Sequence, residues 1–305
     1  MRRFWLLLSG LLALIGMTAG PVSAQSVDSA FSDTIIKTLG YPEVQVEVSP
    51  DGVKAPATLA EGYYLFTLSA TGDSLAYLDV VQPSAGLSPD EELRLMLDAG
   101  RNDLAQPDWV YAGGTNTPNP GETASFVIYL AAGDYKIAAS YYATAQGSEE
   151  IMKLLPLTVT AATPEAASPA ANAEPPATVT LEETDELRYL VSPDPVPAGP
   201  QIWKIANTGM HHAHHVVMMR IPDGVTADQI VAEFKGLMSG TPAAEPPLYA
   251  QFVWVAYAAL QSGGQTTWAE FDLTPGTYAT ICFIIDPATG QPHALNGMVT
   301  VFTVV

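Results

Sequence analysis

The chain has 305 residues, of which 48% are hydrophobic and 14% are charged, and its formal net charge is −20 at pH 7. This length favours about two domains. Many short runs rich in valine, isoleucine, tyrosine and threonine indicate strands joined by turns rather than long helices. The strong negative charge argues against binding to nucleic acid or to anionic membrane surfaces.

The first 24 residues have the features of a cleavable signal peptide. Arg2 and Arg3 precede an apolar stretch at residues 4–19, which is short for a membrane span, and small residues follow at 22–24. The alternative is an uncleaved N-terminal anchor. We expect export to the periplasm, the cell surface or the medium, with no stable membrane insertion after cleavage.

Residues 25–40 are expected to form a loose lead-in, and the strand pattern begins at about residue 41. A short helix is predicted from Pro89 to Ala99, because Ser88 can cap its start and Glu91 can complete a capping box. Alternating or apolar runs predict strands at residues 44–48, 63–69, 125–130, 134–142 and 155–160, with one more near Trp109.

Residues 161–178 differ in kind from what precedes them. They are nearly all alanine, proline, threonine, glutamate and serine, a composition that offers no face to bury. We therefore predict an extended linker that separates a domain at 41–160 from a second domain at 179–305.

The second domain repeats the order of features in the first. The pattern that starts at Gly62 returns at Gly199, and a second helix start returns with Thr226 as the cap and Gln229 closing the box. The segment PGETASFVIYLAAGDY returns as GGQTTWAEFDLTPGTY. Turns, caps and aromatic positions recur in order, which indicates a duplicated unit of ordinary domain size.

The two copies differ where metal-binding side chains stand. The position of His214 is held by Tyr77 in the first copy, and the position of Cys282 is held by Ala139. All five histidines of the chain lie in the second copy, as does the one cysteine. The first copy thus keeps the pattern of the fold and lacks the candidate ligands.

The candidate ligands suit a redox-active copper ion. Thiolate and thioether sulfurs favour Cu(I), imidazole suits both oxidation states, and two histidines, one cysteine and a distant methionine favour neither state strongly. A histidine from an early strand would have to meet a cysteine, a histidine and a methionine on a late loop. The chain offers His214 for the first position, and Cys282, His293 and Met298 for the loop.

From about residue 196 to the end, the sequence resembles the blue-copper or cupredoxin family, which includes plastocyanin. The segment LTPGTYATIC ends at Cys282, PHALNGM contains His293 and Met298, and HHVV begins at His214. The resemblance implies that these four residues hold one type 1 copper that carries one electron. It also implies an all-β fold of two tandem Greek-key β-sandwich domains of cupredoxin type, each with one short helix.

Two features depart from the family pattern. Ten residues separate Cys282 from His293, whereas small blue-copper proteins use two to four; the type 1 site of copper nitrite reductases is similar in having a longer loop. His215 stands where the family often has an asparagine that supports the loop. If His214 points inward, strand alternation sends His215 outward and allows His212 as an alternative first ligand.

Three functions are compatible with these features. The first is an exported one-electron carrier with a redox partner protein, and the second is a copper-handling or storage protein. The third is an extracellular interaction module without a metal, since the first copy keeps the frame without the ligands. An enzyme is not expected, because a multicopper oxidase needs far more than five histidines. The copper-handling hypothesis would use Met210, Met218 and Met219 with His211, His212 and His215.

Overall fold

The computed structural model describes residues 29–49, 51–71, 75–117, 119, 121–142, 150–162, 170–240 and 247–305. The predicted signal peptide at residues 1–24 lies outside the described residues. Among the helices of the described part, none combines the length and the apolar character needed to cross a membrane.

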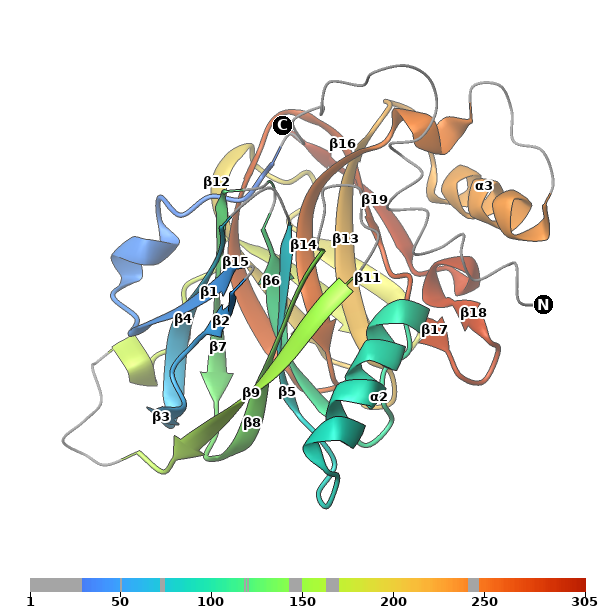
Figure 1. Ribbon diagram of the computed structural model, residues 1–305. Coiled ribbons are helices and arrows are strands. Elements are labelled where there is room, and N and C mark those ends of the chain that lie inside the picture. The colour runs from blue at the N-terminus through green and yellow to red at the C-terminus, as the bar shows by residue number, and fades with distance from the viewer. Residues whose placement is uncertain are drawn as a thin grey trace.

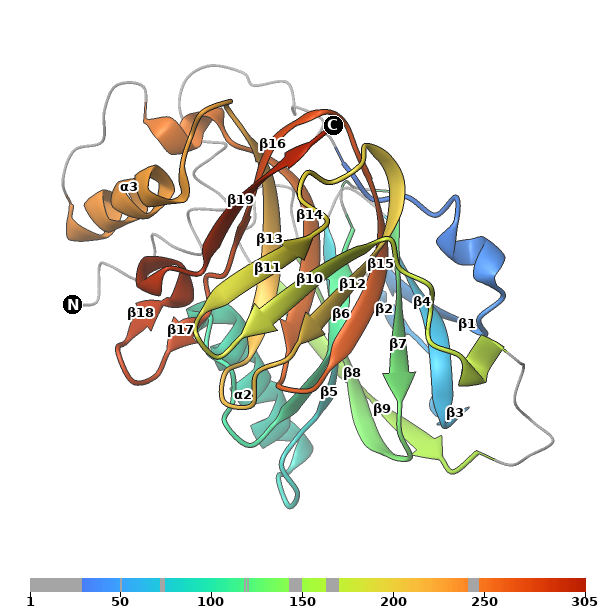
Figure 2. The ribbon, with the colours of Figure 1, turned by 180° about the vertical axis from the view of Figure 1, so that it is seen from behind.

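Two large β-sheets and two α-helices make up the described fold (Figures 1 and 2). The first sheet has the order β11 (Arg188–Ser192), β10 (Val179–Thr184), β12 (Gly199–Asn207), β15 (Thr266–Leu273), β7 (Thr123–Leu130), β4 (Gly62–Ala70), β1 (Glu43–Ser49), β2 (Gly52–Lys54). The second has the order β19 (Val299–Val304), β16 (Gly276–Ile281), β13 (His214–Ile221), β14 (Val253–Gln261), β6 (Val110–Asn116), β5 (Ala76–Gln82), β8 (Gly133–Tyr142), β9 (Glu150–Thr160), β3 (Thr58–Ala60). A small hairpin joins β17 (Ile285–Asp286) and β18 (Gln291–Pro292).

In each large sheet, strands of the C-terminal half lie on one side of a central pair and strands of the N-terminal half lie on the other. Counted outward from that pair, matching strands of the two halves follow in the same order. In the first sheet β15 pairs with β7, and in the second β14 pairs with β6. At the first junction Ala269 lies opposite Phe126, the residue that it matches in the sequence repeat. Both sheets therefore run through both halves of the chain, and the two predicted domains share them. The domain bounds themselves stay a prediction.

The two α-helices begin at their predicted caps. In α2 (Pro89–Asn102) Ser88 and Glu91 form the capping box, and in α3 (Ala227–Ser239) Thr226 and Gln229 do so. The end of α2 reaches the other half of the molecule, because the carbonyl of Asp103 accepts a hydrogen bond from the Ile285 N–H at 2.7 Å. Figure 1 shows α2 beside the β17–β18 hairpin.

The prediction of a loose lead-in before residue 41 is wrong for its described part. Ala30 donates its N–H to the Val255 carbonyl and accepts from the Asp272 N–H. The short 3-10 helix Ile36–Leu39 follows, and Ile36 is fully buried. The buried Glu270 carboxylate binds this segment at four points: Ser32 Oγ (2.8 Å), Thr34 Oγ1 (2.6 Å), and the N–H groups of Ile35 and Ile36 (2.8 Å each).

The linker prediction fails in a similar way at its described end. Of residues 161–178 the structure describes 161–162 and 170–178, and in the second stretch Ala171 and Pro175 are buried. The Tyr41 hydroxyl donates to the Ala173 carbonyl at 2.8 Å. Small residues without an apolar face can still pack where the partner surface fits closely, and here Gly62, the first residue of β4, allows Ala171 to approach.

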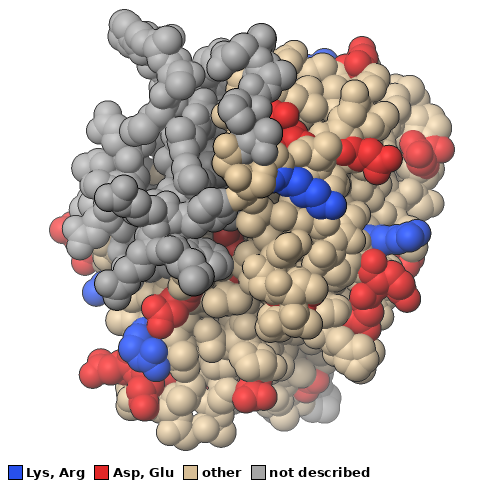
Figure 3. Space-filling view, turned by 90° about the vertical axis from the view of Figure 1, so that its right-hand side faces the viewer, with Lys and Arg blue, Asp and Glu red and all other residues tan. Residues whose placement is uncertain are grey.

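On the face that Figure 3 shows, the visible acidic side chains are not gathered in one patch. The face in Figure 3 shows them at several separate places, with few basic side chains between them. This distribution suits the net charge of −20.

Candidate metal centre

Three side chains from separate elements converge at one end of the C-terminal half. His214 is the first residue of β13, Cys282 directly follows β16, and His293 begins the 3-10 helix His293–Asn296. The two Nδ1 atoms of the histidines lie 3.1 Å apart. Cys282 Sγ lies 3.9 Å from His214 Nδ1 and 3.5 Å from His293 Nδ1. The structure thus brings together three of the four predicted ligands.

These spacings fit a single metal ion. Bonds of about 2.0 Å to imidazole nitrogen and about 2.3 Å to thiolate sulfur place ligand atoms roughly 3 to 4 Å apart around an ion. All three ligand atoms lie within 4.8 Å of one another. Two imidazoles and one thiolate in a near-trigonal set suit copper. The cluster therefore supports a copper-binding protein with one ion held by His214, Cys282 and His293.

The cluster is closed to water. His214 and Cys282 are fully buried and His293 is 1% exposed. Burial, together with a smaller effect of the neighbouring histidines, lowers the pKa of His214 to about 3 and that of His293 to about 4. Both imidazoles are therefore neutral at pH 7, as a metal ligand must be.

The thiol of Cys282 is the acidic group that a metal would have to deprotonate. Burial raises its pKa to about 12, although hydrogen bonds from the backbone of His215 and Ile284 lower it. Those two N–H groups already point at the sulfur and would stabilise a thiolate. Metal binding at neutral pH should accordingly release one proton from this residue.

Met298 is fully buried and is tied to two of the ligands through its backbone. Its carbonyl accepts the Cys282 N–H at 3.2 Å, and its N–H donates to the His293 carbonyl at 3.0 Å. These backbone contacts place the residue next to Cys282 and His293. Its thioether as the distant fourth ligand stays a prediction.

His215 points away from His214, as strand alternation predicts, but it is buried rather than exposed. The residue is 7% exposed, and its Nε2 accepts a hydrogen bond from the Phe283 N–H at 2.9 Å. Alternation does turn it away from His214, but the rings of Tyr257 and Phe283 cover that face of the sheet. His215 thus supports the strand end that carries Cys282, a role that the sequence left in doubt.

His212, the alternative first ligand, lies at the edge of the cluster rather than in it. Its ring centre is 5.4 Å from that of His293 and 6.1 Å from that of His214. Its carbonyl accepts from Asn207 Nδ2 at 2.8 Å, and its N–H donates to Asp185 Oδ1 at 3.3 Å. The backbone of this loop is therefore fixed from both sides, while the imidazole is partly exposed.

Sequence reasoning missed the β10–β11 hairpin, which lies beside the ligands. The Tyr189 hydroxyl donates to the His215 carbonyl and also bonds to the Cys282 thiol. Asp185, in the hairpin turn, accepts the N–H groups of Met210 (2.8 Å) and His211 (2.9 Å) as well as that of His212. The alternation in VTLEET could have indicated the first strand, but nothing local indicates these long-range contacts.

Asp286, the acidic residue of the ligand loop, stabilises a turn. Its carboxylate accepts from the Ala288 N–H at 2.8 Å and from the Thr289 hydroxyl at 2.9 Å. Burial raises its pKa, but these hydrogen bonds outweigh burial and the pKa is lowered. They order the tip of the ten-residue loop between Cys282 and His293.

Among the comparisons with known proteins, the one with solved structures found similar chains, and several of these are copper proteins. No family model matches the sequence, and no curated protein matches it. Dithionite-reduced auracyanin from the photosynthetic bacterium Roseiflexus castenholzii is 21% identical over 41% of this chain and 94% of its own, with a TM-score of 0.27. Auracyanin B is 19% identical over 44% of this chain and 93% of its own, with a TM-score of 0.26.

A longer stretch of the chain is similar to a copper enzyme. The Cu-containing nitrite reductase from Thermus scotoductus is 12% identical over 86% of this chain and 61% of its own, with a TM-score of 0.23. Because all these TM-scores are low, the assignment of a copper site rests on the side chains described above.

Proposed function

We propose that this protein is an exported one-electron carrier with a single type 1 copper. The observation that carries the proposal is the arrangement of two imidazole nitrogens and one thiol sulfur within 4.8 Å of one another, fully enclosed by protein. Ligands that the surrounding fold holds at this spacing need little rearrangement when the ion changes its charge. Small rearrangement is the physical condition for rapid electron transfer.

Copper, when bound, supplies the exchange of one electron between two oxidation states. His214 and His293 would hold the ion as neutral ligands, and Cys282 would hold it as a thiolate. Met298 would contribute a weak fourth contact. Burial keeps water from adding as a further ligand, and the His215 and Tyr189 contacts keep the sulfur in place.

The remaining parts of the proposal concern the whole chain. Residues 1–24 would direct export and be removed, and a redox partner protein would exchange the electron. The N-terminal half would be a copy of the copper-binding half that lacks ligands, with Tyr77 and Ala139 at the positions of His214 and Cys282. We propose an electron carrier rather than an enzyme, because the trinuclear centre of a multicopper oxidase needs far more than the five histidines of this chain.

A titration with Cu(II) tests the proposal. Purified protein should take up one equivalent and develop an intense visible band from charge transfer between thiolate and copper. Cys282→Ser should bind without that band, because the hydroxyl group cannot replace the thiolate. Cyclic voltammetry should then give a reversible one-electron wave for the wild-type protein.

Two other results would redirect the assignment. Copper uptake without the visible band would favour the copper-handling function, and no uptake would favour an interaction module. One observation favours copper handling as a second candidate: Met210 is 77% exposed, next to the exposed His211. Met218 and Met219 do not support it, because both are buried in the core.

A further inference from the structure

The candidate copper site has no exposed ligand through which an ion could enter. The side chains of His214, Cys282 and Met298 are fully buried, and His293 is 1% exposed. A metal site needs a route by which the ion reaches it. Some residue at the boundary must therefore meet the ion before the buried ligands do.

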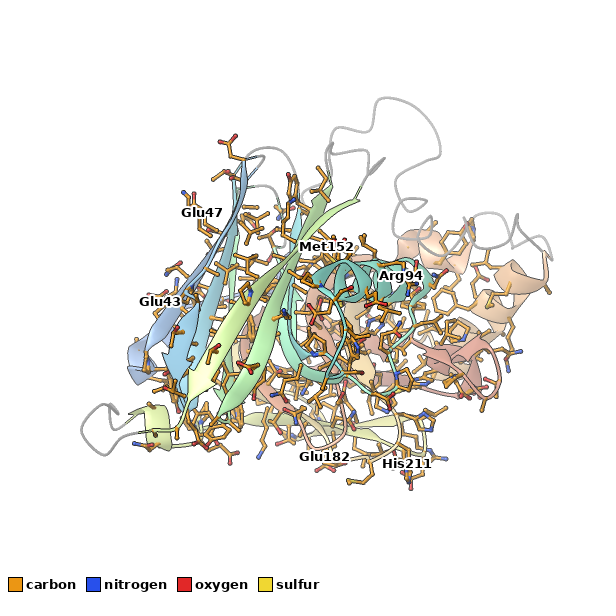
Figure 4. All side chains as sticks on the ribbon, turned by 60° about the horizontal axis from the view of Figure 1, so that its bottom comes forward. Glu43, Glu47, Arg94, Met152, Glu182 and His211 are labelled. Carbon is orange, nitrogen blue, oxygen red and sulfur yellow. The ribbon has the colours of Figure 1, made fainter. Side chains whose placement is uncertain are left out.

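One side chain bridges the surface and the cluster. His212 is partly exposed, and its ring lies 5.4 Å from the ring of His293 and 6.1 Å from that of His214. On its outer side the chain continues to His211 and Met210, which are both exposed. His212 is thus the residue of this loop that lies between solvent and the buried site, and Figure 4 shows His211 on the outer edge of the molecule that Glu182 also occupies.

The loop that carries these residues is held in place by its backbone. Asp185 accepts the N–H groups of residues 210–212, and Asn207 donates to the His212 carbonyl. Gly209 allows this close approach, since a Cβ there would lie 2.5 Å from Asp185 Oδ1. In the described residues the hydrogen bonds of His212 use its backbone, which leaves the imidazole available to a ligand.

The N-terminal half provides an internal comparison. Counted from Gly72 and Gly209, the position of His212 is held by Leu75 in the half that lacks ligands. Met210 and His211 correspond to Asp73 and Ser74 in the same way. The fold therefore does not require a histidine at this position, and the histidine accompanies the metal ligands.

We propose that His212 is the uptake ligand of the copper site, which binds the incoming ion at the boundary and passes it to His293 and His214. The inference rests on the proposed copper function. The transfer is a ligand exchange without a change of oxidation state: the bond from the His212 imidazole breaks as bonds from the two buried imidazoles form. Cys282 then binds as a thiolate and one proton leaves to solvent.

Stopped-flow mixing of metal-free protein with Cu(II) tests this inference, with the visible thiolate band as the signal. His212→Ala should slow the appearance of the band by about tenfold or more, while its final intensity and the copper affinity stay those of the wild type. His211→Ala is the matched control, because its ring is exposed and makes no described ring contact with the cluster; its rate should change little. His212→Gln serves if the alanine variant does not fold.

The possible outcomes distinguish a failure of the role of His212 from a failure of the copper function. An unchanged rate in the folded His212→Ala protein would overturn the role of His212 and leave the copper function standing. Complete loss of the band in that variant would also overturn it, since His212 would then be a permanent ligand. Absence of the band in the wild type would overturn the copper function itself.

Discussion

Glu183 is a buried acidic residue in an environment that should destabilise the fold. It lies on the inward face of β10, it is fully buried, and neither carboxylate oxygen has a hydrogen-bond partner among the described residues. Counted from Gly62 and Gly199, its partner Asn207 on β12 matches Ala70, which pairs with Val48. A buried valine thus suffices in the other half, and the carboxyl group costs stability where it stands.

Replacing this carboxyl group should change how stability depends on pH. Burial raises the pKa of Glu183 from its usual value near 4.5 to about 8. Between these values the folded protein keeps a proton that the unfolded chain has lost, so stability falls as pH rises. In the metal-free protein, Glu183→Gln should remove this decline, and urea unfolding at pH 5 and pH 8 measures it. An equal decline in wild type and variant would show that the carboxyl group is already ionised.

At the scale of elements, the two helices start from equivalent caps in the two halves. Ser88 Oγ accepts the Glu91 N–H at 3.4 Å, and Thr226 Oγ1 accepts the Gln229 N–H at 3.3 Å. Yet the helices contact different things: α2 ends against the ligand loop through Asp103, whereas α3 packs against the core that contains Leu295. The same capping box therefore starts two helices that pack in different environments.

The two caps give a matched pair of variants. Ser88→Ala and Thr226→Ala should each lower the free energy of unfolding by about 1 kcal/mol, because each leaves a helix N–H without its partner. Since both sheets run through both halves, both variants should shift one common urea transition. Two separate transitions, each sensitive to only one variant, would instead mean that the halves unfold independently.

At the scale of the whole molecule, the N-terminal segment ties the two halves together. Residues 29–41 cross from the C-terminal half, where Glu270 binds them, to the N-terminal half, where the chain enters β1. Trp268 and Tyr63, which belong to different halves, lie edge to face with their ring centres 5.6 Å apart. They belong to the hydrophobic cluster in which Ile36 of this segment is also buried. The carboxylate of Glu270 therefore holds this N-terminal segment in place through hydrogen bonds from a distant strand.

Glu270→Gln should weaken this attachment and alter the acid sensitivity of the protein. Burial raises the pKa of Glu270, but the hydrogen bonds from Thr34, Ile36, Ile35 and Ser32 outweigh burial, and the pKa is lowered. Its contribution to stability is thus present above the usual pKa near 4.5 and is lost as pH falls through the lowered value. The variant should be less stable at pH 7 and should show a shallower loss of stability in acid, measured by thermal unfolding. Unchanged acid sensitivity would contradict this role.

The sequence alone determined many of the strands, both capped helices and the set of candidate ligands, because alternation, capping boxes and side-chain chemistry are local properties of a few neighbouring residues. Only the tertiary structure decided which histidine joins Cys282, since His212 and His214 are two residues apart and either could point inward. It also decided that His215 is buried, that residues 29–41 and 170–178 pack, and that both sheets continue through both halves. Each of these depends on what a distant segment presents across the contact, which no local pattern specifies.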